Sequence, residues 1–240
     1  MSLFQFSLSL FICNFLCIFI LLFIGVYRKS PKIFLKYFFL SIMLCAWLGL
    51  IFQQITDIAY LSTRQILGNV IVSIWVMTSF YLHKNLKLNL LSGYLRKFKD
   101  AVVNKQPKTI IFLALYVSLL QMICFSPLVS LNFLSGPSYL DFKDLLSILI
   151  CIIGILMYLQ STRELKLIKN PSKDKLLEHL MHPDYLGNLI FLIGLFLLSS
   201  GATGGAWSII GLVIILLIMD KVIIPENNRR ILEKNSINNL

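Results

Sequence analysis

The amino-acid sequence predicts an all-α fold: a polytopic integral membrane bundle of about seven transmembrane helices. Hydrophobic residues occupy 58% of the 240 positions and charged residues 14%, and the mean hydropathy is +0.82. Soluble domains have about 45–50% apolar and about 25% charged residues. The same composition excludes disordered, collagen-like and disulfide-rich secreted chains, and the length leaves no room for a separate water-soluble nucleotide-binding domain.

Six stretches without a charged residue predict the membrane spans. They cover residues 1–27, 37–56, 65–82, 109–140, 145–162 and 185–219. A helix needs about 20 apolar residues to cross about 30 Å of hydrocarbon. The first, second, third and fifth stretches each fit one span. The fourth predicts one span followed by an extended segment that is broken at Pro127, and the sixth is long enough for two spans.

The sixth stretch predicts a tight helical hairpin over residues 185–224. Clustered glycines mark a turn, and the sequence Gly-Ala-Thr-Gly-Gly occupies residues 201–205, in the middle of the stretch. The two arms are then residues 185–200 and 207–224, and their open ends lie at the same face of the membrane. We expect glycine at the turn because it adopts positive φ freely.

The distribution of positive charge predicts the topology. Of the 22 Lys and Arg residues, 20 lie in the loops of one face and in the C-terminal tail, and only Arg64 and Lys143 lie in the loops of the other face. The positive-inside rule therefore places the N-terminus outside and the C-terminus in the cytoplasm. It applies equally to a bacterial inner membrane and a eukaryotic endomembrane. The rule also accounts for the net charge of +11, so we predict no nucleic-acid partner.

We divide the chain into two membrane regions. Residues 1–144 hold four spans and a basic inner loop, and residues 145–240 hold the remaining spans with the hairpin. The five cysteines all lie in apolar stretches, without histidines at metal-binding spacing, and we predict no metal site. Polar amides in or near the spans are expected to join helices; they are Gln53, Gln54, Asn69, Gln121 and Asn188.

The two open ends of the hairpin carry the candidate site residues. His182 and Tyr185 stand at its start, and Glu226, Arg229 and Arg230 follow its end, about 40 residues later. The hairpin would bring these side chains together at the inner membrane boundary. Imidazole, phenol, carboxylate and guanidinium groups beside an apolar bundle suit a polar cofactor that meets a lipophilic substrate. The alternative is an ordinary helix start with a proline in its first turn, and arginines that anchor the chain at the interface.

Residues 182–187, His-Pro-Asp-Tyr-Leu-Gly, followed by a Leu-rich hairpin and Glu226, resemble the C-terminal region of the isoprenylcysteine carboxyl methyltransferase and phospholipid methyltransferase superfamily. The same region is similar to the steroid 5-alpha-reductase C-terminal family. Lys-Asn-Pro at 169–171 and Trp-Ser-Ile-Ile-Gly at 207–211 look closer to this second family. The resemblance covers roughly residues 150–234.

The first resemblance implies a methyltransferase that uses S-adenosylmethionine and acts on a lipid or prenylated substrate from the bilayer. The cofactor would lie at the inner face, against the candidate site residues His182, Tyr185, Glu226, Arg229 and Arg230, with Tyr185 and His182 nearest the chemistry. Arg230 would pair with the cofactor carboxylate, since guanidinium groups favour planar carboxylates. Glu226 would accept hydrogen bonds from the ribose or the ammonium group.

Two alternatives remain open. The second resemblance implies an NADPH-dependent reductase of a lipid double bond, in which Tyr185 or His182 donates the proton. The third possibility is a non-catalytic member of the fold. Departures from the family patterns support it: Met181 replaces an arginine, Asn188 replaces the glutamate of the reductases, and Asn227 replaces the second of two glutamates. The sequence does not name the acceptor or the oligomeric state.

Overall fold

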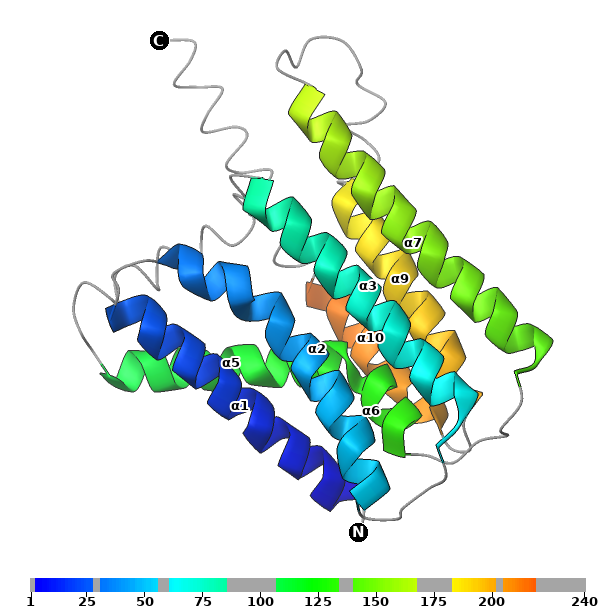
Figure 1. The fold of residues 1–240 in the computed structure, drawn as a ribbon, viewed down its shortest axis with the longest axis horizontal. Helices are drawn as coiled ribbons and strands as arrows, with labels where there is room; N and C mark the ends of the chain where they lie inside the picture. The colour runs from blue at the N-terminus through cyan, green and yellow to red at the C-terminus, as the bar shows by residue number, and fades with distance from the viewer. Residues whose placement is uncertain are drawn as a thin grey trace.

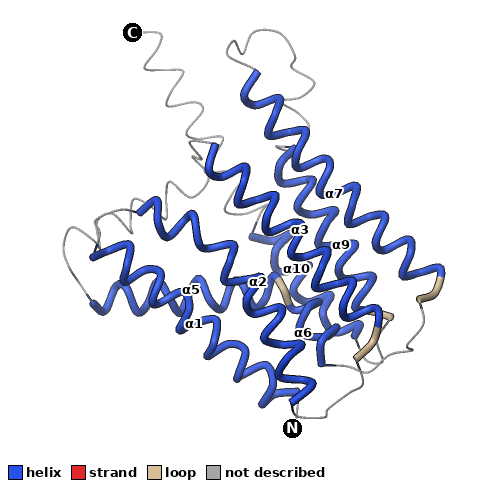
Figure 2. Tube along the Cα trace, viewed as in Figure 1, coloured by secondary structure: helices blue, strands red, loops and turns tan. Residues whose placement is uncertain are grey.

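The computed structural model describes residues 3–27, 31–55, 61–85, 107–133, 140–167, 183–201 and 205–218 (Figure 1). Within these ranges the protein is all-helical and has no strand (Figure 2). The helices are α1 (Leu3–Tyr27), α2 (Pro31–Ile55), α3 (Thr63–Asn85), α5 (Pro107–Cys124), α6 (Ser126–Phe133), α7 (Phe142–Leu167), α9 (Pro183–Ser199), the 3₁₀ turn η1 (Gly205–Ser208) and α10 (Ile209–Ile218). The predicted all-α class is confirmed for this part of the chain.

Two of the described helices are long and apolar enough to cross a membrane: Phe4–Gly25 within α1 and Phe142–Gln160 within α7. The bent pair α5 and α6 makes a third if it counts as one span. Shorter apolar helices occur at Phe39–Ile55, Leu186–Ser199 and Gly205–Ile214. These helices suit a lipid bilayer, but the count of about seven spans is not confirmed. The orientation of the termini and the division at residues 144 and 145, which falls inside α7, stay predictions.

The segment after α5 is helical, which corrects the prediction of an extended exit. The chain bends by 62° between α5 and α6, next to Pro127 as expected. Pro127 is the second residue of α6. There the missing N–H costs no intrahelical hydrogen bond and the fixed φ suits a helix start, so the proline bends the path without ending the helical conformation. Residues 126–132 are all buried.

The main hydrophobic core gathers around Trp75 of α3. Its indole stacks on Phe191 of α9, with ring centroids 5.2 Å apart and planes 8° apart. Phe39 of α2 meets the same ring edge-on, and Phe125, between α5 and α6, packs against it at a tilt. The indole N–H donates to Asn188 Oδ1 at 3.0 Å. One side chain thus ties four parts of the bundle together.

Helices α7 and α9 make the most extensive contact in the described bundle, and they run antiparallel (Figure 1). A Cβ placed at Gly154 of α7 would lie 2.5 Å from the backbone nitrogen of Phe191, and one at Gly187 of α9 would lie 2.6 Å from that of Tyr158. A Cβ at Gly194 would likewise lie 2.7 Å from the backbone nitrogen of Cys151. Small residues at this contact let the two backbones touch.

Candidate functional site

Tyr185 is the third residue of α9, which begins at Pro183 as predicted. The other predicted site residues, His182, Glu226, Arg229 and Arg230, lie outside the described residues, and the Tyr185 side chain does too. The cofactor cluster therefore stays a prediction.

The predicted break in the hairpin is present. Helix α9 ends at Ser199, and a new helical segment begins at Gly205. Helix α10 then turns back and contacts α9 as well as α5 (Figure 1). For Gly201 and Gly205 the reason differs from the expected one, since neither has a φ in the left-handed region, and Gly204 lies outside the described residues. A Cβ at Gly205 would collide with the carbonyl oxygen of Ser199, and one at Gly201 would lie 2.9 Å from the guanidinium carbon of Arg64.

Arg64 and Asp144 form a buried ion pair next to this turn. Arg64 Nε donates to Asp144 Oδ1 at 2.8 Å, and its second nitrogen donates to Oδ2 at 2.6 Å. The side chains are 2% and 0% exposed. The third guanidinium nitrogen has no hydrogen-bond partner. The sequence pattern placed Arg64 in an outer loop, but its side chain is buried and the pair joins α3, α7 and the turn after α9.

Each partner of this ion pair sits in a capping box, a motif in which two side chains cap each other's backbone N–H groups at a helix start. At the start of α3, the Gln65 N–H donates to Ser62 Oγ at 3.3 Å and the Ser62 N–H donates to Gln65 Oε1 at 2.9 Å. At the start of α7, the Asp144 N–H donates to Asp141 Oδ1 at 2.9 Å and the Asp141 N–H donates to Asp144 Oδ2 at 3.1 Å. Both four-residue patterns are readable in the sequence, and they were missed.

Buried amides join helices, as the sequence predicted for Asn69. Asn69 Nδ2 donates to Asn132 Oδ1 at 2.7 Å, and Asn132 Nδ2 donates to the Ala46 carbonyl at 3.0 Å. These bonds connect α3, α6 and α2. Gln121 of α5 likewise exchanges hydrogen bonds with Ser41 of α2.

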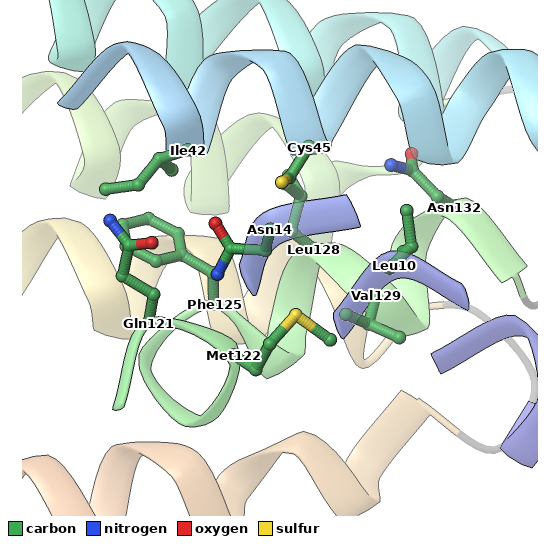
Figure 3. A pocket seen from close by; sticks show the side chains of 10 residues that line it. All are labelled: Leu10, Asn14, Ile42, Cys45, Gln121, Met122, Phe125, Leu128, Val129 and Asn132. Atoms are coloured by element: carbon green, nitrogen blue, oxygen red, sulfur yellow. The ribbon is translucent and has the colours of Figure 1, made fainter. Parts of the chain in front are cut away.

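A small cavity of about 30 Å³ lies beside these amides (Figure 3). Figure 3 shows Asn14 and Gln121 toward one end of it, Asn132 at the other, and the Cys45 thiol between them. Asn14 is 2% exposed. Its Nδ2 donates to the Ser118 carbonyl at 3.4 Å, but its Oδ1 has no hydrogen-bond partner.

A larger groove of about 330 Å³ opens between α1, the α5–α6 bend and α10. Its lining is apolar apart from Ser7, Ser126 and the Trp207 indole. Ser126 Oγ already donates to the Ser208 carbonyl at 3.3 Å. Met122 and Val129 line both this groove and the small cavity. Within the described part of the chain, no group of His, Cys, Asp and Glu side chains is placed to hold a metal ion.

The sequence pattern of a protein family described as proteins of unknown function, DUF1295, matches residues 24–239. No curated protein and no solved structure matches the chain.

Proposed function

The chain belongs to the DUF1295 family, and we propose that it is a membrane methyltransferase that uses S-adenosylmethionine to modify a lipid or prenylated acceptor. The cofactor would be held where α9 begins and where the chain continues beyond α10, by His182, Tyr185, Glu226, Arg229 and Arg230. An NADPH-dependent reductase and a non-catalytic relative are the alternatives that the experiment below separates.

The reversal of the chain between α9 and α10 carries this proposal. Helix α9 has 17 residues and rises about 26 Å at about 1.5 Å per residue. The returning arm, η1 and α10, has 14 residues. It rises about 23 Å, because a 3₁₀ turn gains about 2 Å per residue. Figure 1 shows α10 running back from the turn toward the end of the bundle at which α9 begins, and stopping short of that end. This geometry supports an approach of Glu226 to His182.

Asn188 favours the methyltransferase over the reductase. The reductase-like pattern has a glutamate at this position, directly after Gly187. Here the Asn188 side chain accepts the hydrogen bond of the Trp75 indole at 3.0 Å. The position serves contact between α3 and α9, so it offers no carboxylate to a nicotinamide cofactor.

The chemistry requires positioning above all. The cofactor supplies an electrophilic methyl group, and an in-line displacement needs an acceptor held at the correct distance and angle. Arg230 and Arg229 would bind the cofactor carboxylate, and Glu226 would orient the ribose or the ammonium group. His182 would be placed to take a proton from the acceptor. Tyr185 is the third residue of α9, whose backbone contacts α7 two residues further on, at Gly187.

Thermal unfolding of the detergent-purified protein tests the proposal. S-Adenosylmethionine and S-adenosylhomocysteine should raise the melting temperature, whereas NADPH and NADH should not. A ligand at 100 times its Kd stabilises the folded state by about 2.7 kcal/mol. Arg230→Ala and Glu226→Ala should each weaken cofactor binding by about 1–3 kcal/mol, the cost of a charged hydrogen bond. A shift with NADPH alone would favour the reductase, and no shift with any of the four would favour the non-catalytic relative.

Tyr185→Phe separates the two enzymes by rate. A methyltransferase that uses Tyr185 for packing should keep most of its turnover. A reductase that uses the hydroxyl as its proton donor should lose about 10²–10⁴-fold. The comparison requires equal amounts of folded protein, checked by size-exclusion chromatography.

A further inference from the structure

We propose that the groove between α1, the α5–α6 bend and α10 is a binding site for a lipophilic alcohol, whose hydroxyl group donates to Asn14 in the bundle interior. This site is separate from the proposed cofactor site and does not depend on it. Two independent observations support the proposal: the chemistry of the groove lining and an unpaired oxygen behind it.

The groove suits a hydrocarbon chain. Its volume of about 330 Å³ lies at the lower end of the roughly 300–1,000 Å³ of ligand pockets. No charged residue lines it. One of its walls, α1, qualifies as a membrane span, and the bent pair α5 and α6, which forms another, qualifies if it counts as one span, so we place the groove where hydrocarbon is the solvent. Ser126 is already hydrogen-bonded within the protein and makes no demand for a polar ligand.

The small cavity beside Asn14 supplies the polar end of the site. Asn14 Oδ1 is buried without a hydrogen-bond donor, and an unpaired buried polar atom costs about 1–3 kcal/mol. The cavity of about 30 Å³ has room for a group of water or hydroxyl size. An oxygen that can only accept calls for a donor, and the smallest donor on a hydrocarbon chain is a hydroxyl group.

Met122 connects the two spaces. Met122 and Val129 line the groove on one side and the cavity on the other. Methionine is unbranched and has three rotatable bonds, so it rearranges more readily than any other apolar side chain of its size. Rotation of Met122 opens a path from the groove to Asn14. The hydrocarbon then stays in the groove while the hydroxyl group reaches the amide oxygen.

The test uses two photoreactive probes of equal length, a dodecan-1-ol and a dodecane that carry the same alkyl diazirine. The full-length protein is reconstituted in lipid nanodiscs, and cross-linked peptides are identified by mass spectrometry. Peptides from α1 and α10 should be labelled by both probes. The alcohol should reach half-saturation at a concentration about five- to tenfold lower than the alkane, the equivalent of one neutral hydrogen bond. Asn14→Leu should abolish this difference and leave labelling by the alkane unchanged.

A second pair of variants tests the groove without touching Asn14. Leu119 lines the groove and is 49% exposed, and Leu149 on α7 is 52% exposed but does not line it. Leu119→Trp should reduce labelling by both probes several-fold, whereas Leu149→Trp should not. Equal binding of alcohol and alkane to the natural protein would overturn the hydroxyl assignment, leaving water as the occupant of the cavity. Equal labelling in the two Trp variants would overturn the groove itself.

Discussion

The contact between α7 and α9 differs from the space between α1 and α10 in what lies between the helices. At Gly154 and Gly187 the two backbones touch, and no side chain separates them. Between α1 and α10, large side chains such as Phe11, Met122 and Ile210 line a groove of about 330 Å³, while α10 meets the end of α5 closely at Gly211, where a Cβ would collide with the Ile123 carbonyl oxygen. Backbone atoms thus make the contact between α7 and α9, whereas a groove separates the side chains of α1 from those of α10.

The difference reflects how helices associate in lipid. The lipid tails are as apolar as the side chains, so close van der Waals contact of small residues, more than hydrophobic burial, holds membrane helices together. The α7–α9 pair follows this rule and fixes the start of α9, where Tyr185 lies. The α1–α10 side lacks such a contact along the groove, which leaves room for a ligand. We therefore expect substitutions to be severe in the first region and mild in the second.

The largest effect should come from breaking the ion pair that joins α3 to α7 beside the turn after α9. Arg64→Met should lower the free energy of unfolding by about 3–5 kcal/mol, because it leaves the buried Asp144 carboxylate without its partner. Denaturation of the detergent-solubilised protein by SDS measures the change.

The double variant Arg64→Met with Asp144→Asn is the control. The amide oxygen introduced by Asp144→Asn can still accept the Asp141 N–H, and no buried charge remains at either position. The double variant should therefore be more stable than Arg64→Met alone. If Arg64→Met by itself changes the free energy of unfolding by less than about 1 kcal/mol, well below the cost of an unpaired buried charge, the pair does not hold this end of the bundle together.

Gly187→Ala should have the next largest effect. The new Cβ would lie 2.6 Å from the Tyr158 backbone nitrogen, which cannot move without separating α7 from α9. Overpacking of this kind costs about 1–3 kcal/mol, and it outweighs the gain of up to about 1 kcal/mol in helix propensity. Gly68→Ala is the matched control, since its Cβ would meet the tips of the Leu131 and Leu198 side chains, which can rotate. If both variants lowered the free energy of unfolding by the same amount, this would contradict the backbone contact at Gly187.

Met122→Leu should have a small effect, because it lies in the region that contains space. The two side chains have similar volumes, and such exchanges cost less than about 1.5 kcal/mol even in well-packed cores. We expect Met122→Leu to lower the free energy of unfolding by about 1 kcal/mol or less, measured by the same SDS denaturation. If Met122→Leu lowered the free energy of unfolding as much as Gly187→Ala, the side chains between the groove and the cavity would be packed as firmly as α7 against α9.

The sequence predicted features that depend on local patterns. Charge-free stretches marked the helices, the Gly201–Gly205 cluster marked the break, and Pro183 marked the start of α9, because each depends on residues close in the chain. The amide Asn69 was correctly interpreted as a link between helices. Pro127 showed where the chain bends, but its compatibility with the first turn of a helix was overlooked.

Contacts between distant segments were not predictable in the same way. Gly154 and Gly187 look like ordinary helix interiors, and only their opposition in space makes them a contact. Arg64 and Asp144 are 80 residues apart, and each looks like an exposed loop charge by itself. The unpaired oxygen of Asn14 depends on three neighbouring helices. The predicted cofactor residues depend on the same kind of long-range contact, which is why they require the experiments proposed above.

The smallest effect concerns pH and the start of α7. The pKa of Asp141 is lowered from its ordinary value of 3.8, mainly because the Asp144 backbone N–H donates to this carboxylate, with a smaller contribution from the positive charge of Arg64. A carboxylate with a lowered pKa stabilises the folded state above the unfolded pKa, and this stabilisation is lost as the pH falls through the folded pKa.

Asp141→Asn keeps the capping oxygen, so stability at pH 7 should change little. Below about pH 4, the difference in melting temperature between the natural protein and Asp141→Asn should shift toward the variant, since only the natural protein loses this charge. The other carboxylates titrate in both proteins and cancel in the difference. A difference that stays constant from about pH 7 to about pH 2 would show that Asp141 caps α7 without help from its charge.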